Sequence, residues 1–338
     1  MFARVIRWLK KIFCMDEKTL YEQMVDISKG DEWYKYCVPF DNHPIMDFPL
    51  RLAQGYNMYE YLKIIFKKYY DLLKQVGRSD LMKDAQGLGN AILKSLDEYY
   101  HGNTIAAYEK LEDKLSNVFS GLNEIIVEND IDEGQSFYRM RAESNLNSPK
   151  DFYHTPFNKR YFCGPQRFSV PGYPTLYVAY SKSCCMAEME GYHSLGEFKY
   201  KGERKVKILD LTMNPPIKIK KGVQPIPEEI FLSYWPLIAT CYVVNTVPEG
   251  IDKRQAKFRE EYIIPQLLSL YVKENLVKKG EIWGIRYYTV NKEDLDPCGT
   301  GENDYRNIMF FTEYNSKSPT PYDMELMNNF EFMGSKQV

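Results

Sequence analysis

The residues best suited to chemistry lie in a short segment around a Pro-Gly turn. Arg167 enters this turn, and Gly172 completes it. A short apolar run then carries Tyr177, and Glu188 follows eleven positions later. An arginine binds anionic groups through charge-assisted hydrogen bonds, and a carboxylate stabilises positive charge that develops on a sugar carbon. The segment therefore suits an anionic nucleotide with a labile glycosidic bond.

Two other segments carry candidate residues. Arg139 and Arg141 alternate along a β-rich run, so both side chains point to the same face of the predicted strand. Such a pair can clamp a pyrophosphate, although we expect one member to be structural. Thr289 ends the run that begins at Gly284, and its hydroxyl can both donate and accept a hydrogen bond.

The order of these motifs resembles the RES domain family. That family has an early strand arginine, an Arg-Phe-Asn-x-x-Gly turn, a Leu-Tyr-Leu-Ala strand, a glutamate about a dozen residues on, and a closing Gly-Ile-x-Tyr-x-Ser. The matching positions are Arg139 (or Arg141), 167–172, 176–179, Glu188 and 284–289. The resemblance covers about residues 135–312, and the ordered set carries it. Ser169 replaces the family asparagine and Thr289 replaces the serine, which leaves the role of Thr289 open.

The resemblance implies an ADP-ribosyltransferase-like fold that breaks the bond between nicotinamide and ribose in NAD. Glu188 would stabilise an oxocarbenium-like ribose, Tyr177 would face the nicotinamide or ribose, and Thr289 would hydrogen-bond the ribose or carboxamide. The implied NAD-binding residues are Arg139, Arg141, Arg167 and Gly172. NAD would be a substrate, and no cofactor is implied.

Each candidate also has a structural interpretation. Arg167 can pair with a surface carboxylate, Tyr177 can be a core aromatic, and Thr289 can be an ordinary β-branched strand residue. Glu188 can be a solvated helix residue, with Glu190 as the competing carboxylate. These alternatives stay open at the level of sequence.

Metal and redox chemistry are disfavoured. The four histidines lack ligand spacing, which predicts no metal site, and His154 can either line the pocket or pack internally. No dinucleotide fingerprint occurs, which argues against hydride transfer. Seven cysteines without a Cys-x-x-Cys pair or a secretory signal predict a reducing cytoplasm, with Cys184 and Cys185 as buried small residues.

The elements that position these residues predict an α+β fold in two parts. Helical spacing over 57–76, 80–100 and 104–127 predicts an N-terminal helix bundle within residues 1–130. The mixed-sheet RES domain is expected over 131–315 and a loose tail over 316–338. Its predicted strands are 135–140, 175–180, 206–211, 240–245, 282–289 and 307–312, and its predicted helices are 184–192 and 262–276.

The helical part resembles the HEPN domains found ahead of RES domains. A catalytic HEPN ribonuclease needs a histidine shortly after an arginine, and neither Arg51 nor Arg78 has one. We therefore expect a role in dimerisation, sensing or inhibition. Residues 1–13 form an amphipathic pattern, which suits contact with a membrane surface or a partner, or docking on the protein's own domain.

Composition narrows the function classes. The chain has 338 residues with 44% hydrophobic content, which predicts a packed core, and a net charge of -2, which argues against a nucleic-acid binder. The leading hypothesis is an NAD glycohydrolase or phosphorylase that acts as a toxin or antiviral effector, as a homo-oligomer with an antitoxin or inhibitor partner. The alternatives are a non-catalytic nucleotide sensor and an ADP-ribosyltransferase with a macromolecular target.

Overall fold

The computed structural model describes residues 48–52, 55–122, 126–128, 131–189, 193–202, 206–212, 228–244, 258–277, 283–291 and 304–338. The predicted helix over residues 1–13 lies outside this part of the chain. The chain divides into two compact units that are interleaved in sequence. Unit 1 comprises Met1–Glu124 and Met213–Leu267, and unit 2 comprises Ile125–Thr212 and Leu268–Val338. The domains predicted from the sequence were the contiguous ranges 1–130 and 131–315.

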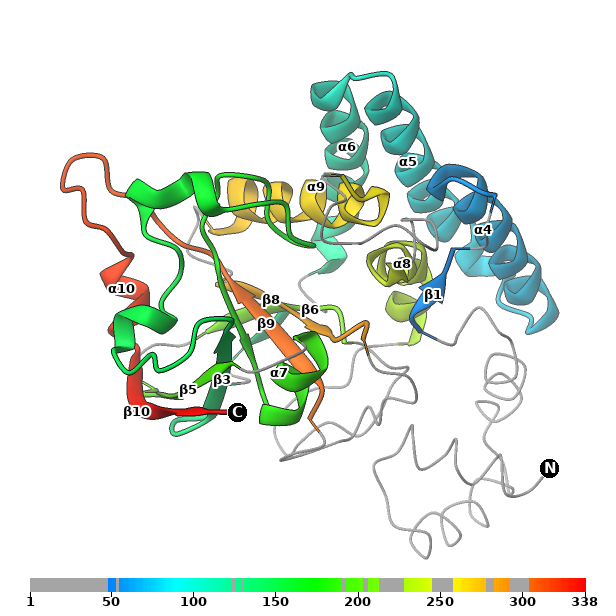
Figure 1. The fold of residues 1–338 in the computed structure, drawn as a ribbon. Coiled ribbons are helices and arrows are strands. Elements are labelled where there is room, and N and C mark those ends of the chain that lie inside the picture. Colours follow the sequence, from blue (N-terminus) through cyan, green and yellow to red (C-terminus); the bar gives the residue numbers. More distant parts are fainter. Residues whose placement is uncertain are drawn as a thin grey trace, which may run out of the picture. The chain divides into compact units, whose positions relative to one another are not determined.

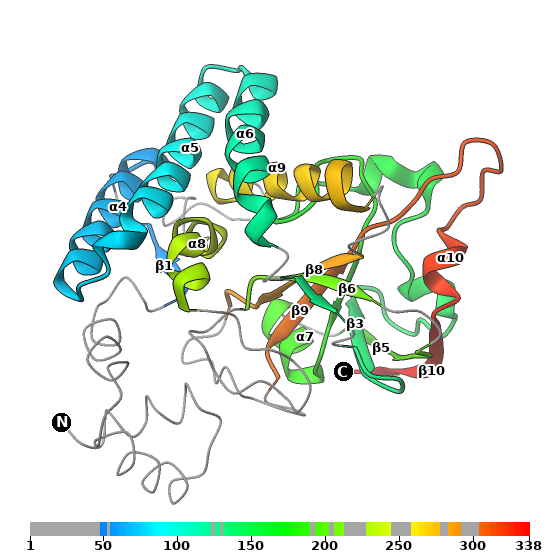
Figure 2. The same ribbon diagram turned by 180° about the vertical axis from the view of Figure 1, so that it is seen from behind.

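Unit 1 is helical, and its first helices follow the predicted spacing. They are α4 (Met58–Gln75), α5 (Met82–Tyr100) and α6 (Thr104–Leu122), with α5 and α6 packed side by side (Figure 2). The side chain of Asn57 starts α4 by accepting a hydrogen bond from the backbone N–H of Glu60 at 2.8 Å. Leu62, Phe66 and Tyr69 then bury one face of the helix. The predicted helix over 57–76 is confirmed.

A further helix of unit 1, α8 (Glu228–Cys241), was not predicted. It contains Pro236, which has no N–H to donate to the carbonyl of Leu232 one turn earlier. The hydroxyl of Tyr69 on α4 donates to that carbonyl instead, at 2.5 Å, and the Tyr69 ring stacks on Trp235 with centroids 4.1 Å apart. The helix therefore tolerates an internal proline because a neighbouring side chain replaces the missing hydrogen bond.

The predicted strand over 240–245 was largely wrong, because α8 runs to Cys241. Among the described residues of this range, the strand is limited to β7 (Val243–Val244), which pairs in parallel with β1 (Leu50–Arg51). The apolar run before residue 240 lacks a polar face, so periodicity could not separate a buried helix from a buried strand.

Unit 2 is built on a mixed sheet of the order β10-β5-β3-β4-β9-β8-β6-β2 (Figure 1). Neighbouring strands are antiparallel except β6 and β8, which are parallel. The strands are β2 (Ile126–Glu128), β3 (Ser136–Arg141), β4 (Leu176–Ala179), β5 (Ser194–Tyr200), β6 (Lys207–Asp210), β8 (Gly284–Tyr288), β9 (Arg306–Phe310) and β10 (Phe330–Gln337). The predicted α+β fold with a helical N-terminal region is confirmed.

Short helices complete the described chain. They are η2 (Ser79–Leu81), η3 (Pro149–Phe152), η4 (Phe157–Phe162), α7 (Lys182–Glu188), η5 (Glu260–Tyr262), α9 (Ile263–Val272), η6 (Lys273–Val277) and α10 (Met324–Met327). The last boundary between the units, after Leu267, falls within α9. None of the described helices combines the length and the apolar character that crossing a membrane requires.

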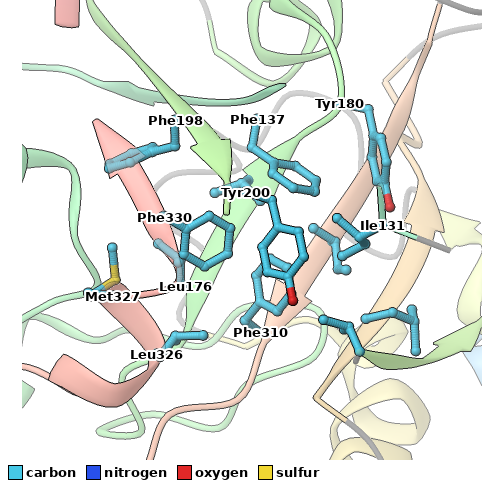
Figure 3. Packing of buried hydrophobic residues seen from close by; sticks show 14 of the residues in the cluster. Ile131, Phe137, Leu176, Tyr180, Phe198, Tyr200, Phe310, Leu326, Met327 and Phe330 are labelled. Atoms are coloured by element: carbon cyan, nitrogen blue, oxygen red, sulfur yellow. The ribbon is translucent and has the colours of Figure 1, made fainter. Parts of the chain in front are cut away.

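The segment predicted as a loose tail is part of the sheet. Strand β10 pairs antiparallel with β5, and Phe330 is 7% exposed in the main aromatic core of unit 2. Its ring lies edge-on to those of Phe137 and Phe310, with centroids 6.0 and 5.4 Å away (Figure 3). The exposed residues of this strand include Glu331, Lys336 and Gln337, and this polar composition favoured the prediction of a tail.

A second correction concerns the end of the third predicted helix. Helix α6 ends at Leu122, and Ile126–Glu128 forms β2, which pairs with β6. The β-branched run at 125–127 fits a strand better than the last turn of a helix.

Candidate functional site

Tyr177 on β4 connects two parts of the candidate site. Its hydroxyl accepts a hydrogen bond from the backbone N–H of Phe168 at 3.1 Å and donates to Oγ of Ser169 at 3.3 Å. Its carbonyl accepts a hydrogen bond from a guanidinium N–H of Arg139 at 2.7 Å. Tyr177 is therefore a positioning residue for the turn that carries Arg167, as well as an aromatic side chain at the site.

The turn itself is tightly held. Gln166 and Ser169 exchange backbone hydrogen bonds of 3.0 and 3.2 Å, and Arg167 between them is 8% exposed. Gly172 has φ +80, a conformation that side chains disfavour, and its N–H donates to the carbonyl of Cys163 at 2.9 Å. Arg167 therefore lies in the turn Gln166–Ser169, and the predicted Pro-Gly turn follows as a separate turn, in which the N–H of Tyr173 donates to the carbonyl of Val170 at 3.2 Å.

Arg139 and Arg141 have different roles on β3. The guanidinium of Arg141 donates to the carbonyls of Asp151 and Tyr153 at 3.1 and 2.7 Å, so it holds a loop. The guanidinium of Arg139 donates to the carbonyl of Tyr177 on β4. The neighbouring residue Tyr138 pairs with Ala179 where β3 and β4 lie side by side. Burial lowers the pKa of both guanidinium groups, and for Arg139 the positive charge of Arg141 adds to the effect. An anion beside this pair would relieve that repulsion.

Glu188 ends α7, a helix that packs on β3 and β4 (Figure 1). The side chain is exposed, and each of its oxygens accepts a hydrogen bond from an asparagine. Nδ2 of Asn307 lies 2.9 Å from Oε1, and Nδ2 of Asn291 lies 2.7 Å from Oε2. The carboxylate is thereby oriented from two sides. The competing carboxylate, Glu190, lies outside the described residues.

Thr289 supports this carboxylate indirectly, through Asn291. It is fully buried, and its Oγ1 accepts a hydrogen bond from the backbone N–H of Asn291 at 3.2 Å. The hydroxyl therefore shapes the turn from which Asn291 reaches Glu188. In this arrangement Thr289 does not reach the site surface, so it affects Glu188 only by positioning Asn291.

Tyr287 on β8 is a site residue that the sequence reasoning missed. Its ring centroid lies 4.8 Å from that of Phe168. Burial raises the pKa of Tyr287, and the negative charge of Glu188 and the neighbouring Tyr177 raise it further, while Arg167 opposes the shift. Tyr287 pairs in the sheet with Asn307, which binds Glu188, and its ring lies beside Phe168 in the turn that carries Arg167. Tyr177 joins the same turn through the N–H of Phe168, and Arg139 joins through the carbonyl of Tyr177.

Signals for some of the missed residues were present in the sequence. Tyr287 stands at the tyrosine of the Gly-Ile-x-Tyr pattern, and Asn307 opens the last apolar run. Asn291 follows the strand in a turn and carries no motif, so its role is visible only in three dimensions.

His154 packs internally. Its ring is fully buried, Nδ1 donates to the carbonyl of Thr155 at 2.8 Å, and Nε2 accepts from the backbone N–H of Asp323 at 2.8 Å. Burial lowers the pKa of His154 to about 4. Of the two interpretations of this residue, the packed one is correct. Within the described ranges, no group of three His, Cys, Asp or Glu side chains could hold a metal ion.

Comparison with known proteins adds one relative to this picture of an α+β protein with a carboxylate-centred site. A protein of Bacillus subtilis (strain 168) with the name "Putative toxin YopC" is 26% identical over 280 residues, which are 74% of this chain. The matched region spans 60% of that protein's length. No family model matches the chain. No solved structure matches it significantly.

Proposed function

We propose that unit 2 cleaves the bond between nicotinamide and ribose in NAD, as a glycohydrolase or phosphorylase. The observation that carries the proposal is the oriented carboxylate of Glu188, which lies in one site with Arg167, Tyr177 and Tyr287. A carboxylate held from both sides can face developing positive charge without reorganising during the reaction. The order of motifs that resembles the RES family supports the same reaction.

In the proposed step the C1′–N bond breaks and its electron pair goes to the pyridine nitrogen. Nicotinamide leaves as a neutral molecule, and the ribose carbon becomes oxocarbenium-like. Glu188 stabilises this cation, and Arg139 and Arg167 hold the pyrophosphate by charge-assisted hydrogen bonds. An oxygen of water or phosphate then forms the new C–O bond, and a proton is released if water is the acceptor.

The similarity to the protein named a toxin supports a toxin role for this chain. Consumption of NAD would harm the cell that makes the enzyme, so a toxin of this kind needs an inhibitor. We therefore include an antitoxin partner in the proposal, and the toxicity can be tested by growth and NAD levels after induction in bacteria.

Nicotinamide release from NAD by the purified protein tests the reaction, with and without phosphate. Glu188→Gln keeps the size of the side chain and removes its charge, so release should fall about 100-fold or more. Glu331→Gln, at an exposed position on β10, is the matched control and should behave as the wild type. Phosphate dependence would identify a phosphorylase. Binding of NAD without release would contradict the proposal and favour the non-catalytic sensor.

A further inference from the structure

Cys184 lies one turn before Glu188 on α7, and its thiol contacts the same asparagine that holds the carboxylate. Sγ of Cys184 donates a hydrogen bond to Oδ1 of Asn307 at 3.3 Å. Nδ2 of Asn307 donates to Oε1 of Glu188 at 2.9 Å. Cys184 is fully buried and Asn307 is 6% exposed, so the contact between the thiol and the amide is shielded from water, whereas the contact with the exposed Glu188 is only partly buried. The three side chains form a continuous relay from the helix interior to the site.

The chemistry of these groups fixes the orientation of the amide. An ionised carboxylate can only accept hydrogen bonds, so Asn307 must turn its NH₂ group toward Glu188. Its oxygen then faces the other way and requires a donor, which the thiol supplies. If the amide rotated by half a turn, its oxygen would face the carboxylate and repel it. The thiol therefore favours the orientation that holds Glu188.

The thiol is suited to this role because it keeps its proton. Burial raises the pKa of Cys184, and the negative charge of Glu188 raises it further. Burial likewise raises the pKa of the neighbouring Cys185 to about 12. Neither side chain is a thiolate near neutral pH, so neither has the reactivity expected of a nucleophile or a redox-active cysteine.

We propose that Cys184 is a positioning residue for Glu188, which it orients by locking the side-chain amide of Asn307. The inference rests on the proposed function only for its kinetic readout. It gives Cys184 a role in the site, although Cys184 is not itself one of the residues that would contact NAD. It also predicts that the two cysteines are not equivalent, although they are adjacent and both buried.

Three variants test the relay through nicotinamide release. Cys184→Ala removes the donor, so kcat should fall about three- to tenfold, with KM for NAD unchanged because binding does not depend on the carboxylate's orientation. Cys184→Ser restores a donor and should restore kcat. Cys185→Ala removes the same atoms from the next buried position and controls for lost packing. Equal kcat losses in the two alanine variants, or no rescue by serine, would overturn the proposal.

A second measurement is independent of catalysis. The side-chain NH₂ signals of Asn307, followed by NMR after selective asparagine labelling, should shift or broaden in Cys184→Ala and remain in place in Cys185→Ala. Unchanged signals in Cys184→Ala would refute the relay. If the wild type released no nicotinamide while the signals changed as expected, the proposed reaction would fail and the relay would stand.

Discussion

Acidification should destabilise unit 2 through the buried imidazole of His154. His154 is fully buried, donates from Nδ1 to a carbonyl, and accepts from the N–H of Asp323 at Nε2. Protonation would put a second proton on the ring, where it would face the N–H of Asp323 and break that hydrogen bond. The positive charges of Arg139 and Arg141 on β3 also oppose a positive charge on this imidazole.

The magnitude follows from the two pKa values. Burial lowers the pKa of His154 from 6.5 to about 4. Between pH 4 and pH 6.5 the imidazole is therefore mostly protonated in the unfolded chain and mostly neutral in the folded unit. The contribution to stability is complete above pH 6.5 and is lost as the pH falls toward 4. Linkage gives a loss of about 2 kcal/mol between pH 8 and pH 5, and roughly 3 kcal/mol in full.

The assay is the free energy of unfolding of unit 2 at pH 8 and pH 5, measured by hydrogen exchange of β3 and β5 in urea. His154→Gln places a neutral acceptor near Asp323, so its stability should fall by about 2 kcal/mol less than that of the wild type. His101→Gln removes an exposed imidazole and should leave the wild-type pH dependence in place. If His154→Gln and the wild type lost the same free energy, the assignment to His154 would be refuted.

Three further perturbations test the fold and the site. Tyr69→Phe should cost about 1–3 kcal/mol of stability, because the carbonyl of Leu232 is left unsatisfied. Adding Pro236→Ala should recover most of this loss. Urea unfolding of the single and double variants measures both effects, and no recovery in the double variant would contradict the explanation. Phe330→Ala should cost about 3–5 kcal/mol by the same measurement, whereas a residue in a loose tail would cost almost nothing. Tyr177→Phe should raise KM for NAD, because the turn that carries the candidate arginine loses its hydroxyl support, and an unchanged KM would argue against that positioning role.

The sequence predicted the elements whose signals are local. Helix α4 has a capping asparagine, a regular apolar stripe and a glycine after its end, and each acts within a few residues. Helix α8 lacked such signals because it is apolar on all sides and contains Pro236. The carbonyl left by that proline is satisfied by Tyr69, which is 163 positions away in the chain. No local pattern could reveal that compensation.

The same distinction applies to the site. Glu188, Tyr177 and Arg167 were found because they belong to one segment with recognisable spacing. The partners of Glu188 are 103 and 119 positions away in the chain, and they approach it because β9 pairs with β4 and β8 pairs with β9 in the sheet. Strand β10 escaped prediction for a related reason, since its partner β5 is far away in sequence.

The interleaving of the two units limits how this protein can be taken apart. The chain passes from one unit to the other at 124/125, at 212/213 and at 267/268. A single proteolytic cut at the first crossing would leave α8 on the fragment that lacks α4 and α5, against which it belongs in unit 1. The sheet-bearing unit therefore cannot be released intact by one cleavage. Truncation of the gene at one position cannot produce that unit alone either.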